Sequence, residues 1–329
     1  MSNMSTALKI RFILAGALLL GCAGSKGSAD SSASVERPGV PMLRLPGAQF
    51  YPESLSVSGD GALYVGSITT GSVVRFASGQ SEASAFLEAG GAVKGVAGVL
   101  VDQESGSLFV CAVDATFQTA PTVQRYDLTT RTLLATYSLP AARDAAPAFL
   151  NDMAFDNAHH LFVTESFGGR IYRVGDVSKS AEMTLWKSDP ALSPQHEKAF
   201  GANGISWDGE GNFFLNNNDT GDVIRIAQDP DGNPGPAQTL TLTPHLDHPD
   251  GQRQLDAKTL LIADNSGELR RVALSATSGT VSDIRTGLDA PTSVVVFGNS
   301  YWVTEGQLTS SLLTGKPPNL PFTIARIPL

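Results

Sequence analysis

Short apolar segments separated by polar turns recur along the chain from Tyr51 onward. Each recurrence has an apolar strand, a polar turn, a second apolar strand, a glycine-containing turn and a third strand that ends near Arg or Lys. Most of these apolar runs do not alternate strictly with polar residues, which is typical of strands covered on both faces. The repeated units are Tyr51–Phe76, Gly95–Leu128, Phe149–Val174, Phe200–Ile226, Pro249–Val272, and Pro291–Glu305 with Thr323–Ile327.

Six such units, each about 40–50 residues long with four strands, predict an all-β fold, a six-bladed β-propeller. A four-stranded sheet cannot bury both faces alone, so the blades are expected to pack radially around a channel. We expect the fourth strands in the connections, as in Ala181–Trp186 and Gln238–Leu242, and Met42–Leu45 as the outer strand that closes the last blade. A β-sandwich is the alternative, but sandwiches do not repeat one phrase six times.

The first residues are typical of an export signal. Lys9 and Arg11 precede Phe12–Leu20, an apolar run of nine residues, which is too short to span a bilayer. Leu19–Cys22 follows on directly and resembles the lipobox of bacterial lipoproteins, in which the cysteine is lipidated. An ordinary signal peptide cleaved between Ala23 and Ala29 is the alternative.

From these features we predict a lipoprotein signal peptide at residues 1–21, a flexible Ser/Gly/Ala-rich tether at 22–40 and a propeller domain at 41–329. Lipidation of Cys22 would anchor the exported protein to the bacterial cell envelope. No later stretch is apolar enough to cross a membrane. The lipid is therefore the expected membrane contact, and the domain is expected to be a monomer outside the cytoplasm.

Composition excludes several classes of function. The net charge of −9, with 23 basic and 32 acidic residues, argues against nucleic acid as the main partner and leaves a small molecule. Two cysteines exclude a disulfide-rich scaffold and a Cys-based zinc cluster, and Cys111, within an apolar run, is predicted to be a small core residue. Neither a Gly-x-Ser-x-Gly elbow nor a phosphate-binding glycine loop is found.

One position in the repeat carries candidate chemistry. The innermost strands of a propeller line its channel, so equivalent positions near their starts should converge at one end of the axis. Counting back from the second strand of each unit places these residues at that position: Glu53, Gly98, Asn151, Asn203, Asp250 and Thr292.

Two carboxylates and two amides in this ring predict a hard-cation site. Calcium binds six to eight oxygen ligands, whereas zinc and copper prefer the Cys and His side chains that the ring lacks. We therefore predict Ca²⁺ as cofactor, held by Glu53, Asn151, Asn203 and Asp250, with another hard divalent cation as the alternative. Without a cation, converging carboxylates should repel and raise a pKa. Individually, Asn203-Gly204 and Asp250-Gly251 are also common turn dipeptides.

Residues 47–328 resemble the senescence marker protein/gluconolactonase family of calcium-dependent six-bladed propellers, which is related to paraoxonase, diisopropylfluorophosphatase and strictosidine synthase-like proteins. The resemblance rests on Pro52-Glu53, Phe149–Asp152, Ala202–Ile205 and Pro249–Gly251. It implies that Glu53, Asn203 and Asp250 bind the metal, that Asn151 binds metal or substrate, and that Asp250 acts as general base or nucleophile. Two departures are the polar pair Gln252-Arg253 and the lack of an arginine near Gly98 that would clamp a sugar acid.

The resulting hypothesis is a calcium-dependent hydrolase of a lactone or related ester, with Asp250 and Asn151 as catalytic residues. A non-catalytic, surface-anchored binding propeller with a structural calcium is the alternative, and a lyase or bond-forming enzyme is a third. Specificity is expected from loops 66–72, 113–122, 187–200, 216–221 and 305–319. Candidate wall or mouth residues in or near them are Phe117, Phe167, Trp186, His196 and His248, although such aromatic residues often belong to a core.

Overall fold

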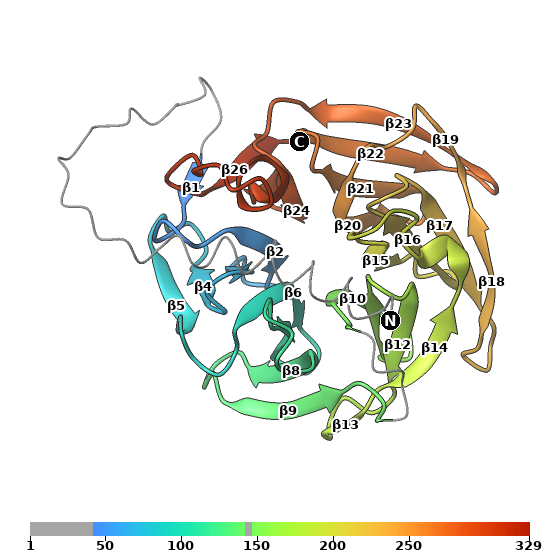
Figure 1. Cartoon of the computed structure of the whole chain (residues 1–329), viewed down its shortest axis with the longest axis horizontal. Helices are drawn as coiled ribbons and strands as arrows, with labels where there is room; N and C mark the ends of the chain where they lie inside the picture. Colours follow the sequence, from blue (N-terminus) through green and yellow to red (C-terminus); the bar gives the residue numbers. More distant parts are fainter. Residues whose placement is uncertain (1–41, 142–146) are drawn as a thin grey trace.

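Six β-sheets surround a central channel in the computed structural model, which describes residues 42–141 and 147–329 (Figure 1). This arrangement confirms the predicted six-bladed β-propeller. The predicted signal peptide, Cys22 and the tether at 22–40 lie outside the described residues. Within the described part of the chain, no helix is long and apolar enough to span a membrane.

Each of the first three blades is built from antiparallel strands that run outward from the channel in chain order. Blade one contains β2 (Pro52–Val57), β3 (Leu63–Ser67), β4 (Val73–Phe76) and β5 (Ala83–Leu87). Blade two contains β6 (Gly95–Asp102), β7 (Ser107–Val113), β8 (Thr122–Asp127) and β9 (Leu133–Ser138). Blade three contains β10 (Leu150–Phe155), β11 (Leu161–Glu165), β12 (Arg170–Val174) and β14 (Thr184–Ser188).

The remaining blades follow the same order, except that the last recruits its outer strand from the start of the domain. Blade four contains β15 (Ala202–Trp207), β16 (Asn212–Asn217), β17 (Val223–Gln228) and β18 (Pro234–Thr239). Blade five contains β20 (Pro249–Asp256), β21 (Thr259–Asp264), β22 (Glu268–Leu274) and β23 (Ser278–Arg285). Blade six contains β24 (Pro291–Phe297), β25 (Ser300–Glu305), β26 (Thr323–Pro328) and β1 (Met42–Arg44).

The predicted closing strand is confirmed. β1 pairs antiparallel with β26, with Leu43 opposite Ile324, and the adjacent Leu45 is buried in the core. This pairing joins the start of the domain to its last blade and closes the ring, because the other strands of blade six come from the end of the chain.

The fourth strands depart from the prediction in one respect. The range Ala181–Trp186 covers parts of two strands, because β13 (Ala181–Glu182) pairs in parallel with β9 of blade two while β14 completes blade three. In the same way, β19 (Thr241–Thr243) pairs in parallel with β23, so Gln238–Leu242 is shared between blades four and five. These outer parallel strands connect neighbouring blades. The helical elements are short: the 3₁₀ turn Pro190–Leu192 and the π turn Leu308–Leu312.

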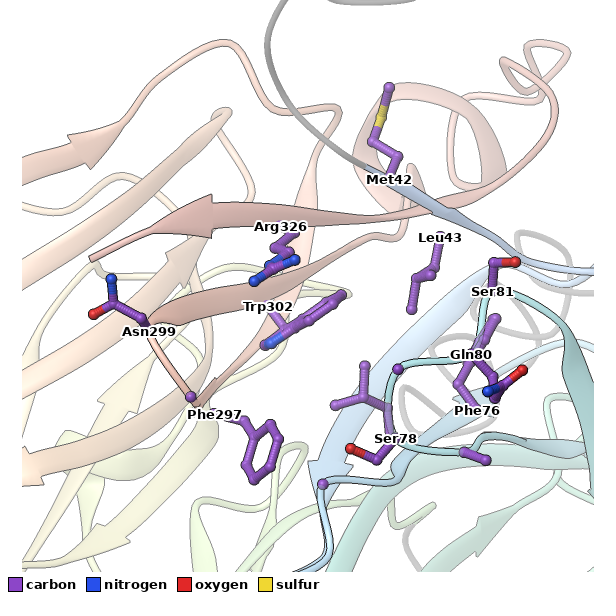
Figure 2. A pocket seen from close by; sticks show the side chains of 15 residues that line it. Met42, Leu43, Phe76, Ser78, Gln80, Ser81, Phe297, Asn299, Trp302 and Arg326 are labelled. Atoms are coloured by element: carbon purple, nitrogen blue, oxygen red, sulfur yellow. The ribbon is translucent and has the colours of Figure 1, made fainter.

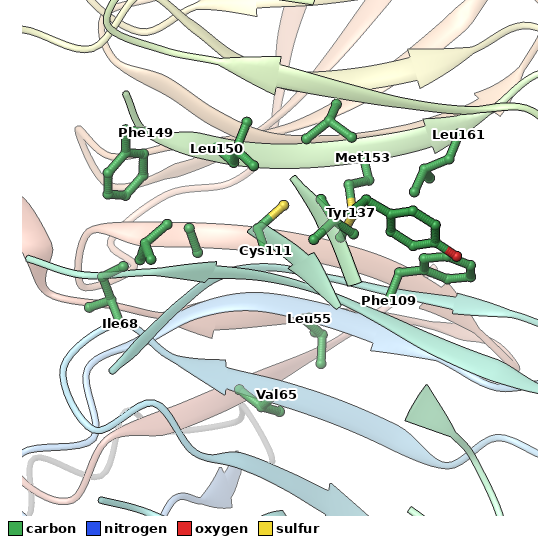
Figure 3. Packing of buried hydrophobic residues seen from close by; sticks show 14 of the residues in the cluster. Leu55, Val65, Ile68, Phe109, Cys111, Tyr137, Phe149, Leu150, Met153 and Leu161 are labelled. Atoms are coloured by element: carbon green, nitrogen blue, oxygen red, sulfur yellow. The ribbon is translucent and has the colours of Figure 1, made fainter. Parts of the chain in front are cut away.

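Apolar side chains fill the space between neighbouring blades. The largest cluster spans blades six, one, two and three and includes Leu55, Phe109, Cys111 and Met153 (Figure 3). Cys111 is fully buried there as a free thiol, which confirms its prediction as a small core residue.

Candidate functional site

The four predicted metal ligands meet at one end of the channel. Glu53, Asn151, Asn203 and Asp250 line a single cavity of about 10 Å³, which is the size of one water or ion. Each is nearly inaccessible to solvent, with exposed fractions of 3–6%. They come from blades one, three, four and five, so the arrangement exists only because the ring closes.

A backbone irregularity turns these side chains toward the axis. In every inner strand the pairing with the second strand shifts register at the ring position, as between Ala202 and Ile205 and between Pro249 and Gln252. Such bulges redirect a side chain that a regular strand would place elsewhere. Asn203-Gly204 and Asp250-Gly251 therefore lie within strands, and the alternative prediction that they form turns is wrong.

The glycines after these ligands are required by packing. A Cβ on Gly204 would lie 2.6 Å from the Asp250 carbonyl oxygen, and one on Gly251 would lie 2.6 Å from the Thr292 carbonyl oxygen. A Cβ on Gly98 would lie 2.2 Å from the Asn151 carbonyl oxygen. Each glycine thus lets the next blade approach closely enough for its ring residue to reach the cavity.

Blade two places a different residue in the ring from the one predicted. Ala97 lines the cavity, and Gly98 takes the position equivalent to Gly204 and Gly251. The assignment of Gly98 was wrong by one residue, because one more residue separates the ring position from the second strand in this blade. Neither residue offers a ligand, so the oxygen set is unchanged.

Two of the carboxylates that line the cavity, Glu53 and Asp250, carry raised pKa values. Burial raises the pKa of Glu53 well above its usual value, and the charges of Asp250 and Asp152 raise it further. Burial likewise raises the pKa of Asp250 to about 7, although hydrogen bonds from Asn265 and Asn203 oppose the shift. The expected repulsion between converging carboxylates is therefore present, and a bound cation would relieve it.

Asp152 and Arg253 form an ion pair beside the cavity that sequence reasoning missed. Arg253 Nη1 lies 2.8 Å from Asp152 Oδ2, and Nη1 also donates to the Gln252 carbonyl oxygen at 2.6 Å. Asp152 lines the same cavity as Glu53 and Asp250. When all three carboxylates are ionised, Arg253 leaves two negative charges around the cavity, which one divalent cation would balance.

The polar pair after Asp250 now has a structural explanation. Gln252 is fully buried, and its amide donates to the Phe214 carbonyl oxygen at 2.8 Å and to Ser206 Oγ at 2.9 Å. Asn216 Nδ2 donates to Gln252 Oε1 at 3.0 Å and to the Asp250 carbonyl oxygen at 2.7 Å. These bonds hold the backbone of β20 in place at Asp250 and Gln252.

The donor set suits a hard cation. Asn203 Oδ1 is buried and has no hydrogen-bond partner, which is costly for an amide oxygen unless a cation or water satisfies it. The Asn151 amide nitrogen is held by Ser166 Oγ at 3.2 Å, which leaves its oxygen available. Within residues 42–141 and 147–329, no group of three or more His, Cys, Asp or Glu side chains is placed to hold a metal. The predicted ligand set is instead mixed, with two carboxylates and two amides, and Asp152 adds a third carboxylate beside it.

Of the other candidate residues, Trp186 lies in the core, whereas His196 and His248 are exposed. Trp186 packs against Phe162 and Phe213 in the core between blades three and four, so it is not a wall. His196 is exposed and pairs with Asp219, and the exposed His248 faces the Asn218 carbonyl oxygen. Asn265, which sequence reasoning missed, donates to Asp250 Oδ2 at 2.9 Å and so orients that carboxylate.

A larger cavity lies at the opposite end of the molecule, between blades one and six (Figure 2). It measures about 320 Å³ and is lined by the turns 77–81 and 297–299 with Leu43, Trp302 and Arg326. Arg326 is the only charged side chain among its lining residues. The larger volume of this cavity does not make it the candidate active site, because the predicted metal ligands line the small axial cavity instead.

Comparison with known proteins supports the propeller fold. The model of the SMP-30/Gluconolactonase/LRE-like region matches residues 51–304, and no curated protein sequence matches the chain. Among solved structures, a luciferin-regenerating enzyme is similar with a TM-score of 0.64 at 15% identity, covering 88% of this chain and 96% of the other. The calcium-binding protein regucalcin from Agrobacterium tumefaciens gives 0.60 at 14% identity, covering 87% and 94%. Virginiamycin B lyase from Staphylococcus aureus gives 0.56 at 12% identity, covering 88% and 99%.

Proposed function

The chain belongs to the SMP-30/gluconolactonase/LRE-like family of lactonase-type propellers, and we propose that it is a calcium-dependent hydrolase of a lactone or related ester. The observation that supports this most is the convergence of four oxygen-bearing side chains on one buried cavity, with Asn203 Oδ1 lacking any partner. The similarity to a calcium-binding propeller agrees with the choice of metal.

Glu53, Asn151, Asn203 and Asp250 would hold the metal. A bound calcium ion supplies Lewis acidity, which polarises the substrate carbonyl and stabilises the negative charge that develops on its oxygen. The chain itself provides the rigid frame: Ser166 fixes Asn151, Asn265 fixes Asp250, and Asn216 fixes the Asp250 backbone.

Asp250 is the proposed general base. Its buried carboxylate lines the cavity, where it would accept a proton from a water molecule beside the bound substrate. Asn265 holds one carboxylate oxygen, which keeps the group in a single orientation while the proton moves. Asn151 would position the substrate next to Asp250, because its amide lines the same cavity.

The test is hydrolysis of lactones and aryl esters by the purified protein with calcium or with a chelator. We expect activity that chelator abolishes, that calcium restores, and that Asp250→Asn lowers by at least about 100-fold. Activity that is unchanged in chelator or in Asp250→Asn would refute the mechanism.

A second candidate is a binding propeller with a structural calcium. The cavity of about 10 Å³ accommodates an ion but not a substrate, so a purely structural ion also fits. This alternative predicts that calcium raises the melting temperature while every lactone and ester tested stays intact.

We also propose that Cys22 carries lipid and anchors the protein to the bacterial cell envelope. Leu19–Cys22 supports this through its likeness to a lipobox. In a bacterial host, Cys22→Ser is expected to move the protein from the membrane fraction to the soluble fraction, and equal membrane retention of both forms would contradict the proposal.

A further inference from the structure

Four phenylalanines form a continuous aromatic cluster at the end of the channel where the ring residues lie. Phe149 contacts Phe200 and Phe167 with ring centroids 5.1 and 5.6 Å apart, and Phe167 contacts Phe200 at 5.3 Å. Phe117 extends the cluster through Phe167, at 5.9 Å. We call these four residues the aromatic wall.

Chain connectivity places the aromatic wall beside the cavity. Phe149 directly precedes the inner strand that carries Asn151, and Phe200 lies two residues before the start of the strand that carries Asn203. Phe117 and Phe167 follow the second strands of blades two and three. Figure 3 shows Phe149 with Ile68 near one end of the buried cluster, while Phe109 and Leu161 lie toward the other.

One serine links the wall to the ring. Ser166 N donates to the Phe149 carbonyl oxygen at 2.9 Å, and Ser166 Oγ contacts Asn151 Nδ2 and donates to the Ala202 carbonyl oxygen. Asn151 and Asn203, which follow Phe149 and Ala202 in the chain, are therefore held in one network with the wall.

The aromatic wall is not simply part of the buried core, because three of its four rings are partly exposed. Phe149 is buried, but Phe117, Phe167 and Phe200 are only half-buried, and Phe117 belongs to none of the buried apolar clusters. Adjacent, partly exposed aromatic rings are typical of surfaces that bind apolar groups.

Phe117 is held in place by a dedicated loop. Its backbone adopts φ 53°, which is unfavourable for a bulky residue and requires support from its surroundings. Asp114 provides that support, because its carboxylate accepts hydrogen bonds from the backbone and hydroxyl of both Thr116 and Thr119, at 2.6–3.1 Å. The loop thus holds the partly exposed Phe117 ring in a fixed position at the end of the channel where the predicted metal ligands lie.

Two of the four segments that carry the wall lack basic groups that would bind a sugar acid. Residues 113–122 and 147–151 contain no lysine or arginine. The polar residues Asn218, Asn265 and His248 come instead from blades four and five, near Asp250. Basic side chains are therefore absent beside Phe117 and Phe149, whereas Arg170, three residues after Phe167, is paired with Glu165, and Lys198 precedes Phe200 by two residues.

We propose that the aromatic wall binds the apolar substituent of the substrate, so that the enzyme prefers lactones or esters with an alkyl or aryl group over polyhydroxylated sugar lactones. The carbonyl would lie over the axial cavity, and the substituent would lie on Phe117, Phe167 and Phe200. A preference in hydrolysis rests on the proposed hydrolase function. Binding of an apolar ligand to the wall does not depend on that function.

The kinetic test compares γ-decalactone with glucono-δ-lactone in the wild type, Phe117→Ala and Phe117→Leu. We expect kcat/KM for γ-decalactone to exceed that for glucono-δ-lactone, and to fall about tenfold in Phe117→Ala, chiefly through KM. Phe117→Leu should restore most of the loss, and glucono-δ-lactone turnover should not change. Leu185→Ala, which removes a similar apolar side chain that is 53% exposed on the outer strand β14, is the matched control and should leave both substrates unaffected.

A binding test separates failure of this proposal from failure of the hydrolase function. Saturation-transfer NMR on Asp250→Asn should show γ-decalactone contacting aromatic protons of the protein, with a weaker signal when Phe117→Ala is added. If the wild type with calcium hydrolyses no lactone while this binding is observed, the hydrolase proposal is refuted and the binding role of the aromatic wall is retained. Equal binding with and without Phe117, or a preference for glucono-δ-lactone, would overturn the proposal.

Discussion

At the scale of single residues, the axial cavity concentrates buried charge that the fold must tolerate without a cation. Asp250 has a pKa of about 7, compared with an ordinary value of 3.8. The folded protein therefore holds this proton more tightly than the unfolded chain does. The resulting stabilisation is complete below about pH 4 and is lost as the pH rises through 7.

This linkage predicts the pH dependence of stability. In chelator, the melting temperature should fall between about pH 4 and 7, and Asp250→Asn should flatten that slope because it removes the titrating group. Calcium should raise the melting temperature of the wild type most at the alkaline end and should have little effect on Asp250→Asn. Thermal unfolding across this pH range is the measurement, and an identical slope in both proteins would contradict the assignment.

The Asp152–Arg253 pair leads to a second prediction at this scale. Both side chains are largely buried, with exposed fractions of 6% and 19%, so Arg253→Gln would leave the Asp152 carboxylate without its counter-charge. We expect Arg253→Gln to lower the free energy of unfolding by about 3–5 kcal/mol. The double variant Asp152→Asn/Arg253→Gln should recover most of that loss and still bind calcium, because no proposed ligand is changed.

Urea unfolding gives the stabilities, and isothermal titration gives the calcium affinity. A double variant that is as unstable as Arg253→Gln would show that the arginine acts through its contacts to backbone oxygens rather than through Asp152.

At the scale of elements, five of the six blades end the second strand on a polar residue, the exception being blade two, where β7 ends at Val113. In blades three and five this residue accepts hydrogen bonds both from the turn that follows it and from the segment that enters the inner strand. Asp264, for example, accepts from the backbone of His248 at 3.0 Å and of Ser266 at 3.2 Å. The equivalent positions are Ser67, Glu165, Asn217 and Glu305.

Removing one of these acceptors should weaken both the blade and the site. Asp264→Ala removes the fully buried carboxylate that accepts from the backbone N–H groups of Asp247 and His248, next to Pro249 and Asp250, so we expect a loss of about 1–3 kcal/mol and weaker calcium binding. Asp229→Ala is the control, since Asp229 accepts comparable bonds from Asp231 and Asn233 in an exposed turn. It should change stability by about 0.5 kcal/mol or less. Equal effects of the two variants would mean that the buried position has no special role.

The repeat also shows what the sequence can and cannot predict. Glu53, Asn151, Asn203 and Asp250 could be found because one pattern recurs at nearly constant spacing, and symmetry then brings equivalent positions together. The Gly98 assignment failed because that spacing varies by one residue in blade two. A position defined by a bulge is therefore located from sequence only to within a residue.

Contacts between blades were beyond the reach of pattern analysis. Asp152 and Arg253 are separated by 101 positions and occupy different places in the repeat, so no alignment of units pairs them. Gln252 looked like a departure from an apolar strand for the same reason, because its partners Ser206 and Phe214 lie in the neighbouring blade. Such partners depend on how the blades pack against each other.

At the scale of the whole molecule, the site depends on ring closure. Blades one and six meet at the axis where Thr292 Oγ1 donates to the Pro52 carbonyl oxygen at 3.1 Å, directly beside Glu53. At the outer edge, β1 joins the same two blades through its pairing with β26, and Leu45 N donates to the Phe322 carbonyl oxygen at 2.8 Å. The position of Glu53 relative to the other ligands is thus coupled to a short strand far from the cavity.

Shortening the chain from its start tests this coupling. A protein that begins at residue 47 loses β1 and the buried Leu45, so we expect its melting temperature to fall by more than about 5 °C and its stabilisation by calcium to shrink. A protein that begins at residue 41 keeps the closing strand and should match the full chain in both respects. If the two shortened proteins melt together and respond equally to calcium, the inner contacts between β2 and β24 hold the ring without β1. Because Glu53 is the only proposed ligand from blade one, a smaller calcium response in the shorter protein would show that ring closure acts on the metal site as well as on the fold.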